Sequence, residues 1–135
     1  MDSTKKTHQG SCHCGKVRFE VVGDSVQASR CNCSVCTKLS WTGWLAKPEA
    51  FEVVAGEESL GSYAPGPNGT RYFCKHCGTM CFGRGELAEV GGAYVSINAN
   101  ALDTLDPHLL PLVYWDGRHD NWHAGPRSEP WPIFP

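Results

Sequence analysis

The chain has 135 residues, 41% of them hydrophobic, and 12 lysines and arginines against 14 acidic residues leave a formal net charge of -2. This length and composition predict one small globular domain spanning residues 1–135. The cations are scattered along the sequence, so no basic patch predicts binding to nucleic acid. No apolar run reaches the roughly 18–20 residues of a membrane helix, and residues 1–9 are polar where a signal peptide would be apolar. We therefore expect a cytoplasmic protein that binds neither nucleic acid nor a membrane.

Short strands separated by turns are predicted along the chain. Val17, Phe19 and Val21 alternate with charged residues, which is the two-residue period of a strand with one buried face. One helical turn is expected after Ser34, a candidate N-cap, another is expected at 103–107, and the tail from Gly117 is expected to be a loop. Further strands are expected at 26–30, 43–46, 51–54, 71–73, 80–83, 93–99 and 112–115, with a glycine- and proline-rich turn at 65–69. The predicted fold class is mainly β.

Cysteine is the residue type that stands out, with eight in the chain, and seven of the eight lie in three short motifs. Cysteines spaced by one or two residues in a tight turn can point at one zinc ion, and a glycine after each outer pair allows the turn to close. Disulfides are less favoured because they need an oxidising compartment. The motifs are Cys12-His13-Cys14-Gly15, Cys31-Asn32-Cys33-Ser34-Val35-Cys36 and Cys74-Lys75-His76-Cys77-Gly78.

Seven cysteines cannot fill two four-coordinate sites. We therefore expect one closed site made of the two outer pairs, and a second ion held by Cys31, Cys33 and Cys36 with one coordination position open. A closed site is structural, whereas an open position is typical of catalytic zinc. A domain of this size buries only roughly 65–70% of the surface that its unfolded chain exposes. Structural zinc, which contributes on the order of 10 kcal/mol to folding in small domains, would compensate for that small core.

Cys81, the eighth cysteine, admits three interpretations. A buried free thiol is favoured, because a lone cysteine in a strand is usually buried. A fourth ligand in the second zinc site and a redox role are the alternatives. If the residues after Gly78 form a strand, Cys81 lies about 13 Å along the chain from Cys77, which is too far to share an ion easily.

Several residues near the motifs admit both a functional and a structural interpretation. Trp41 and Trp44 follow the cysteine triple and either wall a pocket beside the open position or pack in the core. Lys38 either steers an anionic substrate or is simply solvated. His13 and His76 lie inside the outer motifs, where side chains usually face water, so we do not expect them to be metal ligands.

The stretch 114–123 is dense in polar and aromatic residues. We expect it to cover the mouth of the site or to form the edge of a homodimer. One of its titratable residues is a candidate for proton transfer in the site, against a structural role in ion pairs and capping. The candidates are Asp116, Arg118, His119, Asp120 and His123.

With these motifs the chain resembles the glutathione-dependent formaldehyde-activating enzyme family, which also includes the centromere protein V type proteins. The resemblance runs from 10–19 through 31–38 to 73–79. It implies a β-tent fold with two zinc ions per chain. By motif, the implied structural ligands are Cys12, Cys14, Cys74 and Cys77, and the implied catalytic ligands are Cys31, Cys33 and Cys36.

The activity that the resemblance implies is addition of glutathione to formaldehyde, giving S-(hydroxymethyl)glutathione, which is classed with the carbon–sulfur lyases. Three thiolates on Zn²⁺ still allow the ion to accept a substrate thiol, which loses its proton and becomes a nucleophile. The expected partners are therefore a small thiol, glutathione or a similar one, and an aldehyde.

The alternative hypothesis is a non-catalytic, zinc-stabilised module that carries a thiol or binds a protein, because fold alone does not decide function. It predicts a closed second site, for example with Cys81 as the fourth ligand. A methionine sulfoxide reductase and a nucleic-acid-binding zinc ribbon rank below both hypotheses.

Overall fold

A computed structural model of the chain describes residues 6–23, 27–67 and 69–134. Within these ranges the chain is built almost entirely from strands and short turns, with one α-helix, α1, at Ser34–Leu39. The strands are β1 Lys6–Ser11, β2 Arg18–Gly23, β3 Ala28–Cys31, β4 Gly43–Ala46, β5 Phe51–Ala55, β6 Leu60–Gly66, β7 Gly69–Cys74, β8 Met80–Leu87, β9 Gly92–Asn98 and β10 Leu112–Trp115. Single turns of 3₁₀ helix lie at Pro48–Ala50, Glu57–Ser59, Ala88–Val90, Ala99–Ala101, Pro107–Leu109 and Trp122–Ala124. The predicted mainly β class is confirmed.

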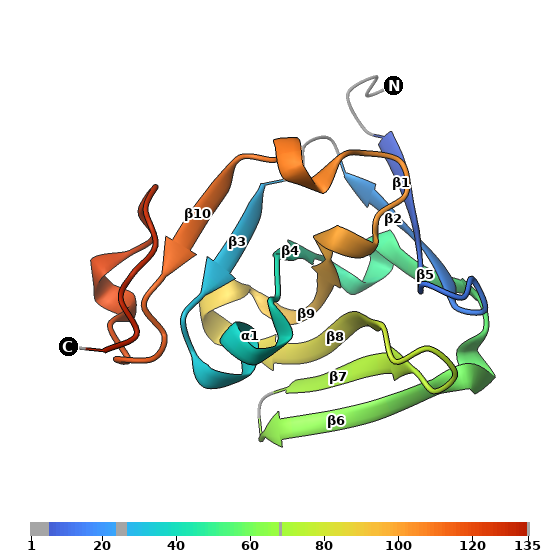
Figure 1. Ribbon diagram of the computed structural model, residues 1–135, viewed down its shortest axis with the longest axis horizontal. Helices are drawn as coiled ribbons and strands as arrows, with labels where there is room; N and C mark the ends of the chain where they lie inside the picture. Colours follow the sequence, from blue (N-terminus) through green and yellow to red (C-terminus); the bar gives the residue numbers. More distant parts are fainter. Residues whose placement is uncertain (1–5, 24–26, 68, 135) are drawn as a thin grey trace.

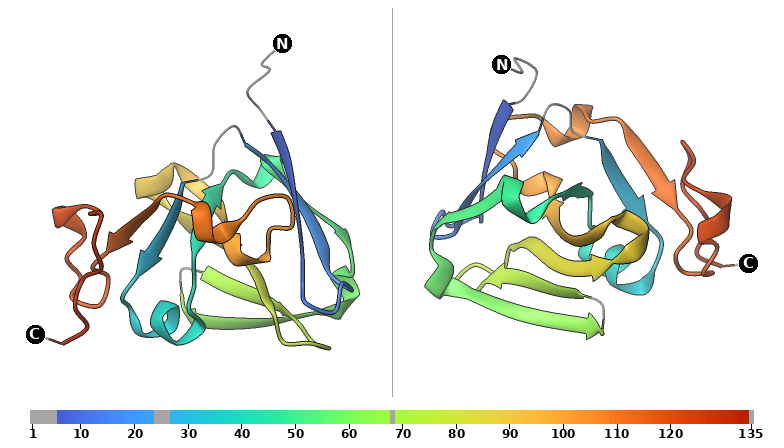
Figure 2. Two further views of the ribbon diagram at one scale, coloured as in Figure 1. Left: turned by 45° about the horizontal axis from the view of Figure 1, so that its top comes forward. Right: turned by 180° about the vertical axis from the view of Figure 1, so that it is seen from behind.

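The strands form two sheets. A three-stranded sheet has the order β1-β2-β5, and a seven-stranded sheet has the order β10-β3-β4-β9-β8-β7-β6. Neighbouring strands are antiparallel except β10 and β3, which are parallel and place Trp115 opposite Cys31. Figure 1 shows the small sheet at one end of the large one and the chain after β10 at the other end, and Figure 2 shows the same arrangement from two further sides. β3 and β10 begin at the core, where Ala28 and Leu112 pack, and end away from it at Cys31 and Trp115.

The hydrophobic core lies where the two sheets meet. Val17, Phe19 and Val21 are all 0% exposed, as their alternation with charged residues predicts. The ring of Phe51 from β5 lies 5.6 Å from the ring of Phe19 and 4.7 Å from that of Phe82, which belongs to β8 of the large sheet. Because burying each such side chain contributes about 1.5–3 kcal/mol, this aromatic cluster joins the sheets.

The register of the central strands determines which residues lie on the face of the large sheet that points away from the core. Arg71 of β7 lies opposite Gly83 of β8, and Gly83 lies opposite Ser96 of β9. Residues directly opposite each other in antiparallel strands point to the same face, and successive residues alternate. Since Phe82 points into the core, Arg71, Gly83 and Ser96 share the face away from it.

The structure contains two strands, β1 and β6, that the sequence analysis does not predict. Both are edge strands, β1 in the small sheet and β6 in the large one. An edge strand packs and pairs on one side only, so it needs less apolar patterning and tolerates proline, as at Pro65 of β6. Polar side chains in β1 and glycine and proline in β6 therefore hide the strand pattern.

The helical turns also differ from the prediction. Ser34 is the first residue of α1, and Cys33 takes the N-cap position without a side-chain hydrogen bond, so the prediction that Ser34 caps this helix is wrong. The turn expected at 103–107 begins later, at Pro107, where the carboxylate of Asp106 accepts the N–H of His108 at 2.9 Å.

Val26, in the strand predicted at 26–30, and Asn68, in the predicted turn at 65–69, lie outside the described residues. None of the helices in 6–23, 27–67 and 69–134 combines the length and the apolar character that a membrane crossing requires.

Candidate metal centres and active-site cavity

Two tight turns bring the outer cysteine pairs together. Cys12 and Cys14 lie between β1 and β2, while Cys74 and Cys77 lie at the end of β7 and in the turn before β8. Their four sulfurs all lie within 4.8 Å of one another, and the described residues contain no other group of three or more potential ligands this compact. The Sγ atom of Cys14 is 3.6 Å from that of Cys12 and 3.7 Å from that of Cys74. Tetrahedral zinc with Zn–S bonds of about 2.3 Å places neighbouring sulfurs about 3.8 Å apart, so the four thiols fit zinc.

Glycine closes both turns. Gly15 and Gly78 have φ angles of 82° and 81°, in the left-handed region that only glycine adopts without strain. Their N–H groups donate to the carbonyl oxygens of Cys12 at 3.0 Å and Cys74 at 2.8 Å. The glycine that follows each outer pair in the sequence is therefore required by the turn that aims the two thiols.

Backbone N–H groups point at the sulfurs of this cluster. Val17 donates to the Sγ atom of Cys12 at 3.3 Å, and His76 donates to that of Cys74 at 3.4 Å. Such donors offset part of the negative charge that four thiolates carry around one divalent ion. Cys12 and Cys74 are buried in the core, which gives the cluster the character of a structural site. The imidazoles of His13 and His76 are exposed.

Cys81 is fully buried in the hydrophobic core. Its thiol donates to the carbonyl oxygen of Thr79 at 3.4 Å. Burial, together with the nearby Cys12, Cys74 and Cys77, raises the pKa of Cys81 to about 12. It neither joins the compact group of four sulfurs nor lines the cavity beside the cysteine triple.

The cysteine triple lies at the other end of the large sheet, where β3 passes into α1. Cys31 ends β3, Cys33 precedes the helix and Cys36 lies inside it. Hydrogen bonds from Cys31 and Cys36 hold the pKa of Cys33 far below its ordinary value, and the charge of Arg71 lowers it further. The same hydrogen bonds raise the pKa of Cys31 and Cys36. Three thiols that interact this closely form a donor set suited to zinc.

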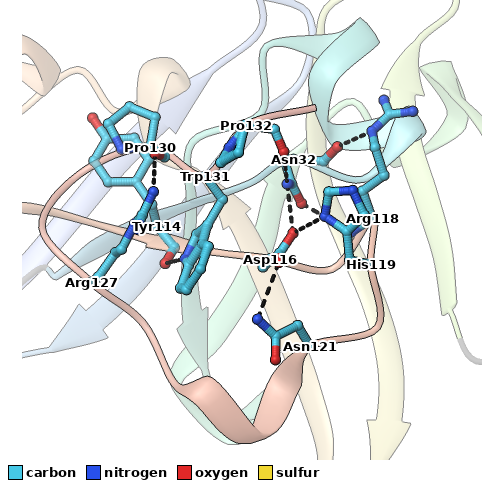
Figure 3. A network of polar contacts seen from close by, with 10 residues as sticks. All are labelled: Asn32, Tyr114, Asp116, Arg118, His119, Asn121, Arg127, Pro130, Trp131 and Pro132. Atoms are coloured by element: carbon cyan, nitrogen blue, oxygen red, sulfur yellow. Dashed lines mark hydrogen bonds and ion pairs between the residues drawn. The ribbon is translucent and has the colours of Figure 1, made fainter. Parts of the chain in front are cut away.

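Asn32, between the first two cysteines of the triple, ties the motif to the C-terminal tail (Figure 3). Its side-chain nitrogen donates to a carboxylate oxygen of Asp116 at 2.8 Å and to the carbonyl of Pro132 at 3.0 Å. Its side-chain oxygen accepts the backbone N–H of Arg118 at 2.9 Å. The amide therefore fixes the loop that carries Cys31 and Cys33.

Asp116 is the buried centre of this network, with 5% of its surface exposed. Besides Asn32, its carboxylate accepts hydrogen bonds from Nδ1 of His119 at 2.6 Å and from Nδ2 of Asn121 at 3.2 Å. Burial alone would raise the pKa of Asp116, but the three hydrogen bonds outweigh burial and hold that pKa below its ordinary value. A single ionised carboxylate thus organises the tail around the triple.

A cavity of about 530 Å³ opens beside the triple. The wall includes Cys31, Cys33, Cys36 and Trp41 and glycines from several strands, and the part of the chain that the structure describes adds no aspartate or glutamate to it. Trp41, which is 6% exposed, lines this cavity, as the functional interpretation predicts. Trp44 packs in the core, as the structural interpretation predicts. None of the five titratable tail residues at 116–123 lines this cavity.

Arg71 is a feature of the site that the sequence analysis did not identify. Its Nη2 atom donates to the Sγ atom of Cys36 at 3.5 Å, and its guanidinium lies 4.6 Å from the ring centroid of Trp41. The sequence holds little signal for this, because a single arginine in a short strand is ordinary. Lys38, the cation considered for substrate steering, is exposed and does not line the cavity.

A second hollow, of about 340 Å³, also borders Cys31 and Cys36. Tyr114, Trp115 and Trp131 line it, and the indole N–H of Trp131 donates to the carbonyl oxygen of Tyr114 at 2.9 Å. The aromatic residues of the tail therefore lie beside the triple.

Comparison with known proteins identifies the family. The model of the glutathione-dependent formaldehyde-activating enzyme family matches residues 7–115, and the chain belongs to this family. A protein of Halomonas elongata, named provisionally as a glutathione-dependent formaldehyde-activating enzyme, is 37% identical over 79 residues. That alignment covers 51% of this chain and 50% of the Halomonas protein, so the chain spans about half the length of this relative.

The fold is also found in a crystal structure of a Rhodobacter sphaeroides protein. The two chains are 29% identical with a TM-score of 0.66, and the match covers 79% of this chain and 98% of the other.

Proposed function

We propose that this protein is an enzyme that forms or cleaves a thiol–aldehyde adduct, with Cys31, Cys33 and Cys36 as the ligands of a catalytic zinc ion. One contrast carries the proposal: this triple lines a cavity of about 530 Å³, whereas the four-cysteine cluster is packed against the core. Membership of the formaldehyde-activating family supports glutathione and formaldehyde as substrates. The reaction would then be of the carbon–sulfur lyase type, with S-(hydroxymethyl)glutathione as the adduct.

Each part of the site has a role in this proposal. Cys31, Cys33 and Cys36 would hold the zinc ion, which would supply the Lewis acidity that favours the deprotonated form of a thiol near neutral pH. The cavity admits the thiol and the aldehyde next to the triple. Arg71 places a positive charge beside Cys36 and offsets part of the negative charge of three thiolates. Trp41 and the tail restrict the access of water.

The four-cysteine cluster would hold the second, structural zinc ion of the chain. It lies between the β1–β2 and β7–β8 turns and has no part in the reaction. Its role in the proposal is to hold the two sheets together, so that the cavity at the opposite end keeps its shape.

Exchange NMR tests the proposal, because it measures the rate at which glutathione and formaldehyde interconvert with their adduct. Zinc-loaded protein is expected to accelerate this interconversion, and Cys33→Ser is expected to return it to the uncatalysed rate with the fold retained. Ser34→Ala, at the exposed neighbouring position, is the matched control and should behave like the parent. No acceleration by the parent, or equal acceleration by Cys33→Ser, would contradict the proposal. A parent that binds the thiol without accelerating exchange would support the non-catalytic thiol carrier instead.

A further inference from the structure

Two arginines line the cavity beside the triple. They are Arg71 and Arg84, and no aspartate or glutamate is found among the described residues of its wall. The ion pairs found in the described part of the chain involve neither arginine. Arg71 contacts the thiol of Cys36, and a partly buried guanidinium that also faces a cavity attracts an anionic ligand.

Only one of these two arginines faces the triple. Arg71 lies opposite Gly83 and Arg84 lies opposite Thr70, so the two side chains leave the sheet on opposite faces. The guanidinium of Arg84 lies 5.3 Å and 5.5 Å from the ring centroids of Phe51 and Phe82, on the core side. That of Arg71 lies against Trp41 and Cys36.

The guanidinium of Arg71 is held in place and still has free donors. Trp41, over which it stacks, is itself fixed by a hydrogen bond from its indole N–H to Ser96 at 3.3 Å. Arginine has five N–H donors, and the hydrogen bonds found in 6–23, 27–67 and 69–134 use only one side-chain donor of Arg71, on Cys36. The remaining donors match the two oxygens of a carboxylate.

The sheet leaves room for such a ligand. Gly83, opposite Arg71 on the same face, has no side chain, and a Cβ atom there would already lie 3.6 Å from Cγ of Arg71. Arg71 and the triple line the same cavity, so a ligand that fills this cavity lies beside the guanidinium.

We propose that Arg71 determines the specificity of this site by binding the carboxylate of a substrate thiol. The sulfur of that thiol would bind the metal ion that Cys31, Cys33 and Cys36 hold. The inference rests on the proposed function and narrows its substrates to thiols that also carry a carboxylate, of which glutathione is one. Neutral and cationic thiols of the same size are the ligands that Arg71 discriminates against.

Cobalt-substituted protein provides the test, because the visible absorption of cobalt reports a thiol joining its ligands without any turnover. The probes are 3-mercaptopropionate, 2-mercaptoethanol and cysteamine, which differ mainly in the charge opposite the thiol. We expect the parent to bind 3-mercaptopropionate about tenfold more tightly than 2-mercaptoethanol, and cysteamine most weakly. Arg71→Met is expected to reduce the preference to about twofold or less by weakening the acid alone. The readout is the ratio of the two affinities, for 3-mercaptopropionate and for 2-mercaptoethanol, compared between the parent and the variant. Differences in thiol pKa between the probes are the same in both proteins and therefore cancel.

Lys38→Met is the matched control. It removes a positive charge from α1, the helix that carries Cys36, but from an exposed position that does not line the cavity, so it should keep the preference of the parent. Arg71→Lys keeps the charge and loses the two-pronged geometry, so a several-fold drop in the preference is expected. If Arg71→Met does not fold or loses metal, the preference measured with Arg71→Lys tests the role of Arg71 instead.

The outcomes separate the inference from the function on which it rests. If the parent binds all three thiols but without preference, or if Arg71→Met weakens all three equally, the proposed function stands and the role of Arg71 is refuted. An unchanged preference in folded Arg71→Lys and Arg71→Met refutes it as well. If no thiol alters the cobalt spectrum of the parent, the proposed function fails and the inference fails with it.

Discussion

The backbone of Gly117 lies directly against the sulfur of Cys31: a Cβ atom on Gly117 would lie 2.5 Å from that sulfur. On the same side it would meet the ring of Trp122 at 2.7 Å. The residue two positions earlier, Trp115, pairs with Cys31 in the sheet, and Asp116 holds Asn32. The tail after β10 is thus one wall of the cysteine triple, and the triple depends on it for its position.

Gly117→Ala is expected to displace either Cys31 or the tail, because the added methyl group has no free space. We predict a loss of about 1–3 kcal/mol in the free energy of unfolding, as for overpacking in a core. Adduct formation should fall at least about tenfold if the displaced Cys31 raises the barrier by about 1.4 kcal/mol or more. Urea denaturation and exchange NMR measure the two effects. Ala124→Ser, which adds one atom at an exposed position of the same tail, is the control. A Gly117→Ala protein with the stability and rate of the parent would show that the contact is not important.

Asp116→Asn is expected to lower the Tm at neutral pH, because an amide cannot accept all three hydrogen bonds that the carboxylate accepts. It should also change the pH dependence of stability. The pKa of Asp116 is held below its ordinary value of 3.8, so its contribution is present above that value and is lost as the pH falls through the lower pKa of the folded protein. Tm measured from pH 7 to pH 3 should therefore fall more steeply for the parent than for the variant. Parallel curves with equal Tm at pH 7 would contradict this, and Asp120→Asn in the same exposed turn is the control.

The two cysteine groups should differ in what their loss does to stability. Cys74→Ser removes a ligand of the cluster in the core, and structural zinc contributes on the order of 10 kcal/mol, comparable to the roughly 5–15 kcal/mol of a whole domain. We predict that this variant does not fold cooperatively. Cys33→Ser, in a partly exposed loop, should cost at most about 1–2 kcal/mol. Circular dichroism during urea titration measures both, and equal losses or the reverse order would count against a structural cluster and a functional triple.

Cys81→Ala tests whether the eighth cysteine is only a packed thiol. Removal of a buried sulfur should leave a small cavity and lower the free energy of unfolding by about 1–2 kcal/mol. Zinc content should not change, because Cys81 belongs to neither group of sulfurs. A variant that loses one zinc ion would instead identify Cys81 as a ligand. Cys81→Ser, which keeps a donor for the carbonyl of Thr79, provides the comparison with matched size.

The sequence predicts the local parts of this structure well. The alternation of Val17, Phe19 and Val21 locates a buried strand face, because side-chain direction in a strand depends only on sequence parity. The glycines after the outer cysteine pairs, Gly15 and Gly78, are recognisable because the tight turns need positive φ angles. Short-range geometry thus explains why the cysteine motifs were the clearest signal.

Long-range contacts are the part that the sequence does not show. Arg71 contacts a cysteine 35 positions away, and Asn32 contacts Asp116 across 84 positions. No local period encodes either pairing, since each depends on how the strands are ordered in the large sheet. The edge strands β1 and β6 were missed for a related reason, because partial burial requires little apolar patterning.

The central claim is that the chain holds two zinc ions in different roles, one in the closed cluster and one at the open triple. Zinc per chain, measured on purified protein and on Cys33→Ser, tests it most directly. The account predicts two zinc ions in the parent and one in Cys33→Ser, with cooperative unfolding retained in both. One zinc ion in the parent, or two in Cys33→Ser, would contradict it.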